Sequence, residues 1–262
     1  MTHGAISKQI ALLEHWLGVK LFKRSPGGVA PTLAGHAYRQ EVAAALDRIA
    51  SATTSLSGHD KPDTLDINAP PTFTIRWLVP RLSKFQIRHP ALEIRLNTQR
   101  SDVSSALRGA DVVIRRGPAS WRGVDSQLFL REAITPVCSP RFLRRKSVES
   151  PADLARQVWL YADARPGDWS SWLRAAGVPN LMPERALHFD HSALSLEAAI
   201  DGMGVAMGPI SMIQTEIEAG TLVLPYPKLV ARTPGYYAIC GRHSVAESKV
   251  RQFRDWLAGE GG

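Results

Sequence analysis

The sequence lacks the features that mark membrane, secreted and metal-dependent proteins. No apolar run in its 262 residues approaches the roughly 18 residues that a membrane-spanning helix needs. The first residues, Met1 to Ala5, do not show the basic-then-apolar order of a secretory signal. The two cysteines, Cys138 and Cys240, have the spacing of neither a metal site nor a disulfide framework. We therefore expect a cytoplasmic protein without membrane association, metal ion or cofactor.

The motifs of common enzymes are also missing. Gly202 and Gly204 follow a predicted helix, whereas the glycines of a dinucleotide-binding turn follow a strand. His188 and His191 lack the spacing and the glutamate of a zinc-protease helix, and no Gly-x-Ser-x-Gly nucleophile elbow occurs. With 44% hydrophobic and 21% charged residues the chain has the composition of a folded globular protein. We expect no enzymatic activity.

Positive charge is concentrated near the amino end. The net charge of the chain is +8. Residues 1–40 hold five lysines and arginines against one acidic residue, so half of the surplus lies in less than a sixth of the chain. An anionic partner such as nucleic acid is therefore expected to contact this segment.

Residues 2–31 contain the pattern of a helix followed by a basic hairpin. The apolar side chains of the helix, at i, i+4, i+7 and i+11, are Ile6, Ile10, Leu13 and Leu17. Residues 19–24 alternate apolar and basic side chains, and a Pro-Gly-Gly turn at 26–28 leads back through 29–31. A helix with one polar face and a basic hairpin is typical of a DNA-binding winged motif.

A longer helix is predicted over residues 32–57, because no proline interrupts this segment and Gly58 follows it. At 1.5 Å per residue such a helix would be roughly 39 Å long. The residues spaced alternately by four and three are Val42, Leu46, Ile49, Thr53 and Leu56. We interpret residues 32–58 as a dimerising linker helix; the alternative is a surface helix packed on its own domain.

The remainder of the chain alternates short β-branched runs with helical segments. Strands are predicted at 65–68, 92–96, 111–114, 134–138, 186–189 and 205–207, and helices at 73–88, 103–107, 169–176 and 192–201. Such alternation predicts an α/β fold with largely parallel sheets. The hydrophobic segments suggest two halves that divide near Arg131.

The amino-terminal residues strongly resemble the DNA-binding motif of LysR-type transcriptional regulators. The matching residues, in order, are Thr2-His3-Gly4-Ala5-Ile6-Ser7-Lys8-Gln9-Ile10, Leu13-Glu14, Leu17-Gly18-Val19, Leu21-Phe22, Arg24 and Pro31-Thr32-Leu33-Ala34-Gly35. Segments that look like the family's branch of glycine-cleavage activators and β-lactamase regulators are Phe73 to Leu82, Asp111 to Gly117, and Phe189-Asp190-His191-Ser192. The resemblance covers nearly the whole chain.

This resemblance implies a fold and a function. It implies a partial winged helix-turn-helix over 1–31, a linker helix over 32–58, and an effector-binding domain over 61–262 that is similar to a periplasmic binding protein. Lobe 1 would comprise about 61–130 and 241–262, and lobe 2 about 131–240, with two crossover strands and a ligand cleft between them. The implied function is transcriptional regulation, in which a small anionic effector modulates DNA binding. The implied partners are double-stranded DNA, the effector, RNA polymerase and further copies of the chain, as a homodimer or homotetramer.

The sequence departs from the family's pattern at its start. The family's recognition helix is preceded by two helices, and here nothing precedes Met1. A misassigned start codon and a truncated gene both explain this difference, and either predicts weak operator binding and exposed apolar surface around the first helix. The alternative function is a cytoplasmic small-molecule-binding protein that has lost DNA binding.

Residues of two kinds are candidates for DNA contact. On the polar face of the first helix, the candidates for contact with bases and nearby phosphates are His3, Gly4, Ser7 and Lys8. In the hairpin, Lys23 and Arg24 are candidates for contact with phosphates, which contribute affinity but no sequence choice.

The candidate effector-binding residues are Thr72, Thr74, Asp111, Arg115, Ser192, Tyr236 and Tyr237. Thr72 and Ser192 each stand at the start of a predicted helix, where free N–H groups and the helix dipole favour an anion. Read alone, each is an ordinary N-cap. The resemblance places them on facing lobes of the cleft, where together they would suit a carboxylate. Asp111 can bind an amino group or merely cap a turn.

Overall fold

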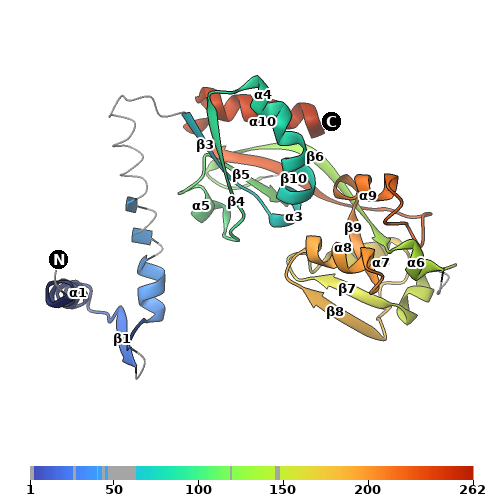
Figure 1. Ribbon diagram of the computed structural model, residues 1–262, viewed down its shortest axis with the longest axis horizontal. Coiled ribbons are helices and arrows are strands. Elements are labelled where there is room, and N and C mark those ends of the chain that lie inside the picture. Colours follow the sequence, from blue (N-terminus) through green and yellow to red (C-terminus); the bar gives the residue numbers. More distant parts are fainter. Residues whose placement is uncertain are drawn as a thin grey trace. The chain divides into compact units, whose positions relative to one another are not determined.

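The computed structural model divides the chain into two compact units, Met1–Lys61 and Pro62–Gly262, which we describe separately (Figure 1). The residues that the structure describes are 3–25, 28–39, 41–42, 45–46, 63–118, 120–144 and 148–261. No helix within these ranges is long and apolar enough to cross a membrane.

The first unit contains the predicted helix and hairpin. Helix α1 (His3–Leu17) ends at Gly18, whose φ of 68° lies in the left-handed region that glycine adopts without strain. Strands β1 (Phe22–Ser25) and β2 (Gly28–Pro31) pair in antiparallel fashion, with Phe22 opposite Pro31. The predictions of a helix and a two-stranded hairpin are confirmed.

One buried carboxylate joins the helix to the hairpin. Glu14 accepts hydrogen bonds from the backbone N–H groups of Leu21 (2.9 Å) and Phe22 (3.0 Å) and from Lys20 Nζ (2.7 Å). The Lys20 ammonium and the two N–H groups lower the pKa of this carboxyl. The three hydrogen bonds that this one side chain accepts therefore fix the connection between α1 and β1.

The segment after the hairpin is helical wherever it is described. Residues 33–39, 41–42 and 45–46 are helical, and Val42 and Leu46 are exposed. The other heptad residues of the predicted linker helix, Ile49, Thr53 and Leu56, lie outside the described residues, so the dimerising role stays a prediction.

The second unit is built on one eight-stranded sheet. Its strands are β3 (Asp63–Asn68), β4 (Leu92–Asn97), β5 (Val112–Arg116), β6 (Val124–Val137), β7 (Val158–Ala162), β8 (Arg185–Phe189), β9 (Val205–Pro209) and β10 (Ala231–Gly241). Their order is β4-β3-β5-β10-β6-β9-β7-β8. The neighbouring strands at each end of the sheet run parallel to one another, as predicted. The long central strands β10 and β6 are antiparallel to each other; β10 is also antiparallel to β5, and β6 to β9.

The helices of this unit are α3 (Pro71–Phe73), the π-helical turn η1 (Thr74–Leu78), α4 (Val79–Arg88), α5 (Val103–Ala106), α6 (Pro140–Leu143), α7 (Asp168–Ala175), α8 (Ser192–Ile200), α9 (Gln214–Glu218) and α10 (Ser248–Gly261), with 3-10 turns η2 (Pro151–Arg156), η3 (Ile210–Met212) and η4 (Ser244–Ala246).

The predicted helix over 73–88 begins two residues earlier, at Pro71, and its second turn is the π-helical turn η1, which is wider than an α-helical turn. This wide turn lies just before Pro80, which has no N–H to donate to the carbonyl four residues back.

Two groups of buried side chains define two lobes. In the part with β3–β5, α4 and α10, which we call lobe 1, the core includes Phe73, Trp77 and Phe253. In the part with β7–β9 and α6–α9, which we call lobe 2, it includes Trp159 and Trp172. Strands β6 and β10 run through both lobes (Figure 1), so the lobes are connected by crossover strands, as the sequence resemblance implies.

Candidate functional site

Thr72 and the start of α8 meet between the lobes. The hydroxyl oxygen of Thr72, in α3, accepts a hydrogen bond from the backbone N–H of Ala193 in α8 at 3.0 Å. Thr72 and Ser192 are both buried. A polar side chain of lobe 1 thus occupies the amino end of a nine-residue helix of lobe 2. The structure brings these two predicted residues together, and their binding of an effector stays a prediction.

Tyr236 lies beside this contact. Its ring stacks on Phe73, the neighbour of Thr72, with 5.0 Å between centroids, and its hydroxyl accepts a hydrogen bond from Arg165 Nη1 at 3.2 Å. Burial raises the pKa of the Tyr236 phenol above its ordinary value, so the hydroxyl stays protonated at neutral pH. Tyr236 is therefore a neutral hydrogen-bonding group at the meeting point of the lobes.

Thr74 supports the turn that positions Thr72. Its hydroxyl donates to the carbonyl oxygen of Pro70 at 3.1 Å, and its backbone N–H donates to the same oxygen at 2.9 Å. Because the Thr74 hydroxyl is used within its own helix start, we interpret it as a structural residue of α3 and η1.

Arg115 and Tyr237 lie on the opposite face of the sheet, contrary to our expectation that they join the other candidates. In the β5–β10 pairing Tyr237 stands opposite Arg115, while Tyr236 stands opposite Arg116. Adjacent residues of a strand point to opposite faces, so the side chains of Tyr236 and Tyr237 lie on opposite faces of the sheet. Effector contacts of Arg115 and Tyr237 stay predictions. Arg115 donates to Asn68 Oδ1 at 2.6 Å and to backbone carbonyls, and Tyr237 packs edge-on against a tryptophan ring.

Asp111 also lies away from the other candidates. It precedes β5 at the amino end of that strand, whereas Thr72 follows the carboxyl end of the parallel strand β3. Its carboxylate accepts hydrogen bonds from the backbone N–H of Asp66 and from Lys249 Nζ, both at 2.9 Å. Asp111 thus ties β3 and α10 to β5, apart from the other candidates, and its contact with an effector stays a prediction.

A buried ionic cluster, which sequence reasoning missed, adjoins Tyr236. The carboxylate of Asp168 accepts from Arg116 Nη1 at 2.8 Å and from Arg165 Nε at 2.5 Å. Burial raises the pKa of the nearby carboxyl of Glu132, whose Oε2 accepts from the Ser211 hydroxyl at 2.8 Å. The one sequence signal was the turn before α7, in which Arg165 and Asp168 lie three residues apart.

Arg76 forms a second contact between the lobes that sequence reasoning missed. From η1 it pairs with Glu197 of α8 at 2.5 Å and with Glu216 of α9. The Arg76 side chain is only 7% exposed, and its Nε is buried without a hydrogen-bond partner. Thr72 and Arg76 therefore bind successive turns of α8 from the same helical segment of lobe 1.

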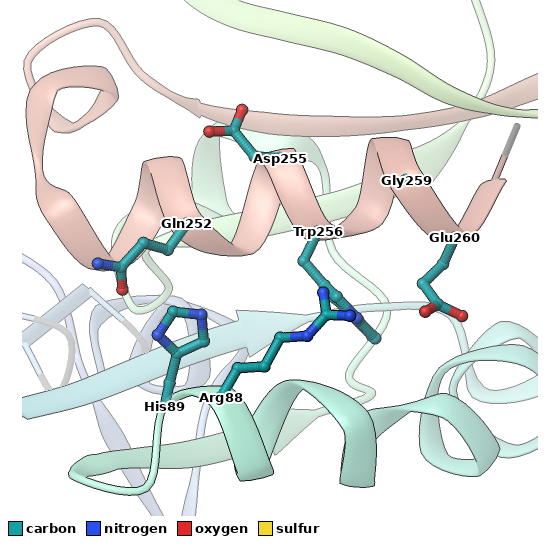
Figure 2. Close-up of a pocket in the computed structure, with 7 residues that line it drawn as sticks. All are labelled: Arg88, His89, Gln252, Asp255, Trp256, Gly259 and Glu260. Carbon is teal, nitrogen blue, oxygen red and sulfur yellow. The ribbon is translucent and has the colours of Figure 1, made fainter.

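A surface groove of about 440 Å³ lies elsewhere, between α4 and α10 (Figure 2). Arg88 and His89, at the end of α4, face Gln252 and Trp256 of α10 across it. It contains none of the predicted effector residues. Binding sites are marked by convergent buried polar groups as well as by volume. We therefore place the candidate site at Thr72, Ser192 and Tyr236.

The candidate DNA-contact residues lie on the first unit. Gly4, Ser7 and Lys8 are exposed on α1, and Lys23 is exposed on β1. The side chains of His3 and Arg24 lie outside the described residues.

Apolar surface is also exposed in the first unit. Ile6 is 43% exposed and Trp16 81%, while Ile10, Leu13 and Leu17 are half-buried. Part of the predicted apolar stripe of α1 is therefore open to solvent in this chain.

Comparison with known proteins matches both units to one family. The family model of the LysR substrate binding domain matches residues 59–262, and that of the bacterial regulatory helix-turn-helix protein, lysR family, matches residues 1–36. The glycine cleavage system transcriptional activator of Escherichia coli K12 is 33% identical over 258 residues, which are 98% of this chain and 84% of that protein. The activator AmpR of Pseudomonas aeruginosa is 36% identical over 259 residues, 98% of this chain and 86% of that protein.

Solved structures agree. The effector domain of AmpR from Pseudomonas aeruginosa superposes with a TM-score of 0.66 at 34% identity, covering 75% of this chain and 94% of that one. CrgA of Neisseria meningitidis, a LysR-type regulator, has the same fold over 100% of this chain and 90% of that one, with a TM-score of 0.66 at 21% identity.

Proposed function

The chain belongs to the LysR family of bacterial transcriptional regulators, and from this premise we propose that it binds double-stranded DNA in the cytoplasm under the control of a small anionic effector. DNA contact is assigned to α1 and the β1–β2 hairpin, and effector contact to the meeting point of the two lobes. We further propose that copies associate through residues 32–58, as a dimer or tetramer, and that the DNA-bound form contacts RNA polymerase.

The surface of the first unit supports the DNA assignment. Small and polar side chains on α1, Gly4 and Ser7, permit close approach to a groove, and Lys8 can reach guanine acceptors or phosphate. Lys23 and Arg24 supply positive charge on the hairpin, which suits phosphate contact.

The contact between Thr72 and α8 is the observation on which the effector assignment rests. The N–H of Ala193 now donates to a neutral hydroxyl. A carboxylate is a stronger acceptor at a helix amino end, so an anionic effector would replace Thr72 as the partner of this N–H. A solved variant of the Citrobacter freundii AmpR effector-binding domain has a threonine, a serine and a tyrosine substituted, the residue types that meet here.

Replacement of this contact would link effector binding to the distance between the lobes. Thr72 and Ala193 belong to different lobes, so a ligand inserted between them favours a different lobe arrangement. A ligand shifts such an equilibrium by its difference in affinity for the two arrangements. We propose that this shift reaches the first unit and alters DNA binding.

The proposal is tested by fluorescence anisotropy with the full chain and duplexes selected from a random pool. Affinity should fall linearly with the logarithm of salt concentration, with a slope set by the number of phosphates contacted. Lys23→Ala should make the salt dependence of affinity less steep, by about the amount that one phosphate contact contributes, and should lower the affinity for all duplexes equally. Lys8→Ala should instead change which duplexes are bound most tightly. Lys84→Ala, an exposed lysine of the second unit, is the matched control. Absence of salt-dependent binding to any duplex would leave the small-molecule-binding protein as the better description.

A further inference from the structure

A small internal cavity lies in lobe 2, next to the amino end of α8. Its volume is about 10 Å³, and it is lined on its polar side by Arg165, Asp168, Trp169, Ser192 and Ser195. Leu160 of β7 contributes apolar surface. A volume of this size holds a single water-sized atom, so the cavity can take one atom of a larger molecule but not the molecule itself.

Two donors on the lining side chains have no acceptor. Arg165 Nη2 and Trp169 Nε1 are both buried and make no hydrogen bond with any residue that the structure describes. The Arg165 side chain is 8% exposed, and its Nε and Nη1 already bind Asp168 and Tyr236. A buried donor without a partner is unfavourable, so both groups favour a ligand atom that accepts hydrogen bonds.

The charge around the cavity favours an anion over a neutral acceptor. Arg116 and Arg165 share the single carboxylate of Asp168. Burial works against the charge on Arg165, but its interactions with Tyr236, Asp168 and Glu132 outweigh burial, so the pKa of the guanidinium is raised. Glu132, a further acid near Arg165, is buried, and burial raises the pKa of its carboxyl. The two guanidinium groups are thus paired directly with one carboxylate, and the positive end of the α8 dipole lies beside them at Ser192.

We propose that this cavity is an acid-binding subsite, which receives one carboxylate oxygen and holds it with Arg165 Nη2 and Trp169 Nε1. The inference rests on the proposed function and deepens it: the acidic end of the effector enters lobe 2, while the rest of the molecule lies toward Thr72. Arg165 supplies the charge that the neutral residues Thr72, Ser192 and Tyr236 do not.

Formate, titrated into the full chain labelled with ¹⁵N-tryptophan, tests the subsite. The chain has seven tryptophans, and Trp169→Phe identifies the indole signal of interest. At constant ionic strength, formate should move the Trp169 indole N–H signal saturably, because a new acceptor polarises this bond. Formamide, which is neutral and of similar size, should move it little. Arg165→Met should weaken formate binding by roughly tenfold or more, the effect of losing a hydrogen bond to charge.

The control is Arg174→Met, which removes an exposed arginine from the same helix as Trp169; formate affinity should be unchanged. The other six indole signals report whether Arg165→Met folds, and Arg165→Lys, which retains the charge, should bind formate with intermediate affinity. A saturable shift of the Trp169 signal that is equal with formamide or chloride would overturn the proposal, as would equal formate affinity in Arg165→Met and wild type.

Larger carboxylates distinguish the source of the acid. If, in the chain labelled with both ¹⁵N-tryptophan and ¹⁵N-alanine, N-acetylglycine moves the signals of Trp169 and of the Ala193 amide, the subsite serves a molecule that spans the cleft. If formate alone binds, the same chemistry serves a free small anion. Because DNA binding is measured in a separate experiment and is assigned to residues of the first unit, loss of formate binding with intact salt-dependent DNA binding contradicts this subsite alone.

Discussion

At the scale of single residues, the lobes meet through charged and polar groups that are buried. Asp168 is shared by two arginines, and Glu132 is buried beside Arg165 without forming a direct pair with it. Titratable groups whose pKa is shifted by burial and by a specific charge neighbour are concentrated at functional sites. Here such groups surround Tyr236, which was a candidate residue from the sequence. The residues that sequence reasoning missed therefore lie next to the candidate site and enlarge it.

Glu132 gives stability a pH dependence. Burial raises its pKa above the ordinary value of 4.5, and the groups that face it are Arg165, Tyr236, the Ser211 hydroxyl and the backbone N–H of Ala133. The folded state thus keeps a proton that the unfolded state releases above pH 4.5. Its stabilising contribution is full below that pH and is lost as pH rises through the raised pKa. As pH rises from 4.5 through the raised pKa of Glu132, the wild-type protein should therefore lose stability relative to Glu132→Gln.

Denaturant unfolding at a series of pH values measures this difference. Glu184→Gln, at an exposed glutamate, is the matched control and should differ from wild type by the same amount at every pH. A pH-independent difference between wild type and Glu132→Gln would show that folding does not shift the pKa of this carboxyl.

At the scale of elements, the hairpin and the helix after it are held by close backbone contact. Thr32 donates its hydroxyl to the carbonyl of Lys20 at 2.7 Å and accepts from the N–H of Gly35 at 3.0 Å. A Cβ on Gly35 would lie 2.0 Å from the carbonyl oxygen of Leu21. Glycine at this position is therefore required by packing, since its backbone conformation is one that other residues adopt.

Gly35→Ala should destabilise the first unit by about 1–3 kcal/mol, the usual cost of forcing extra atoms into a packed contact. Gly4→Ala is the control, because a Cβ there meets nothing within 4 Å; alanine in α1 should leave stability equal or slightly higher. Amide exchange in α1 and the β1–β2 hairpin is the measurement. Unchanged exchange in Gly35→Ala would mean that the hairpin can move away from the helix at little cost.

At the scale of the whole molecule, local periodicity predicted the elements but not their pairing. The strands at 65–68, 92–96 and 186–189 were found from short β-branched runs, whereas most of β6 was missed because its outward residues include charged and amide side chains. Which of Tyr236 and Tyr237 faces the candidate site depends on the register of β10 against β5, and this register cannot be read from the sequence. Arg116 and Asp168 are 52 positions apart, so their ion pair could not be inferred from spacing.

The contacts of Arg76 with α8 and α9 should control how readily the lobes separate. Removing this side chain breaks the pairs with Glu197 and Glu216 at once. Glu197 is 65% exposed, so its pair is weak, while that with the 22%-exposed Glu216 is stronger. We expect Arg76→Met to lower the free energy of lobe opening by about 1–2 kcal/mol. Amide exchange at the start of α8, including Ala193, should then accelerate by roughly five- to thirtyfold.

Arg95→Met is the matched control for this prediction, because Arg95 pairs with Glu93 within a single strand of lobe 1 at 3.0 Å. It should leave exchange in α8 unchanged. The double variant Arg76→Met with Glu197→Gln should show less than the sum of the two single effects, since both changes remove one shared contact. If Arg76→Met left exchange at Ala193 unaltered, the hydrogen bond from the Ala193 N–H to the Thr72 hydroxyl would be sufficient to hold the lobes together, and Arg76 would stabilise only the start of its own helix.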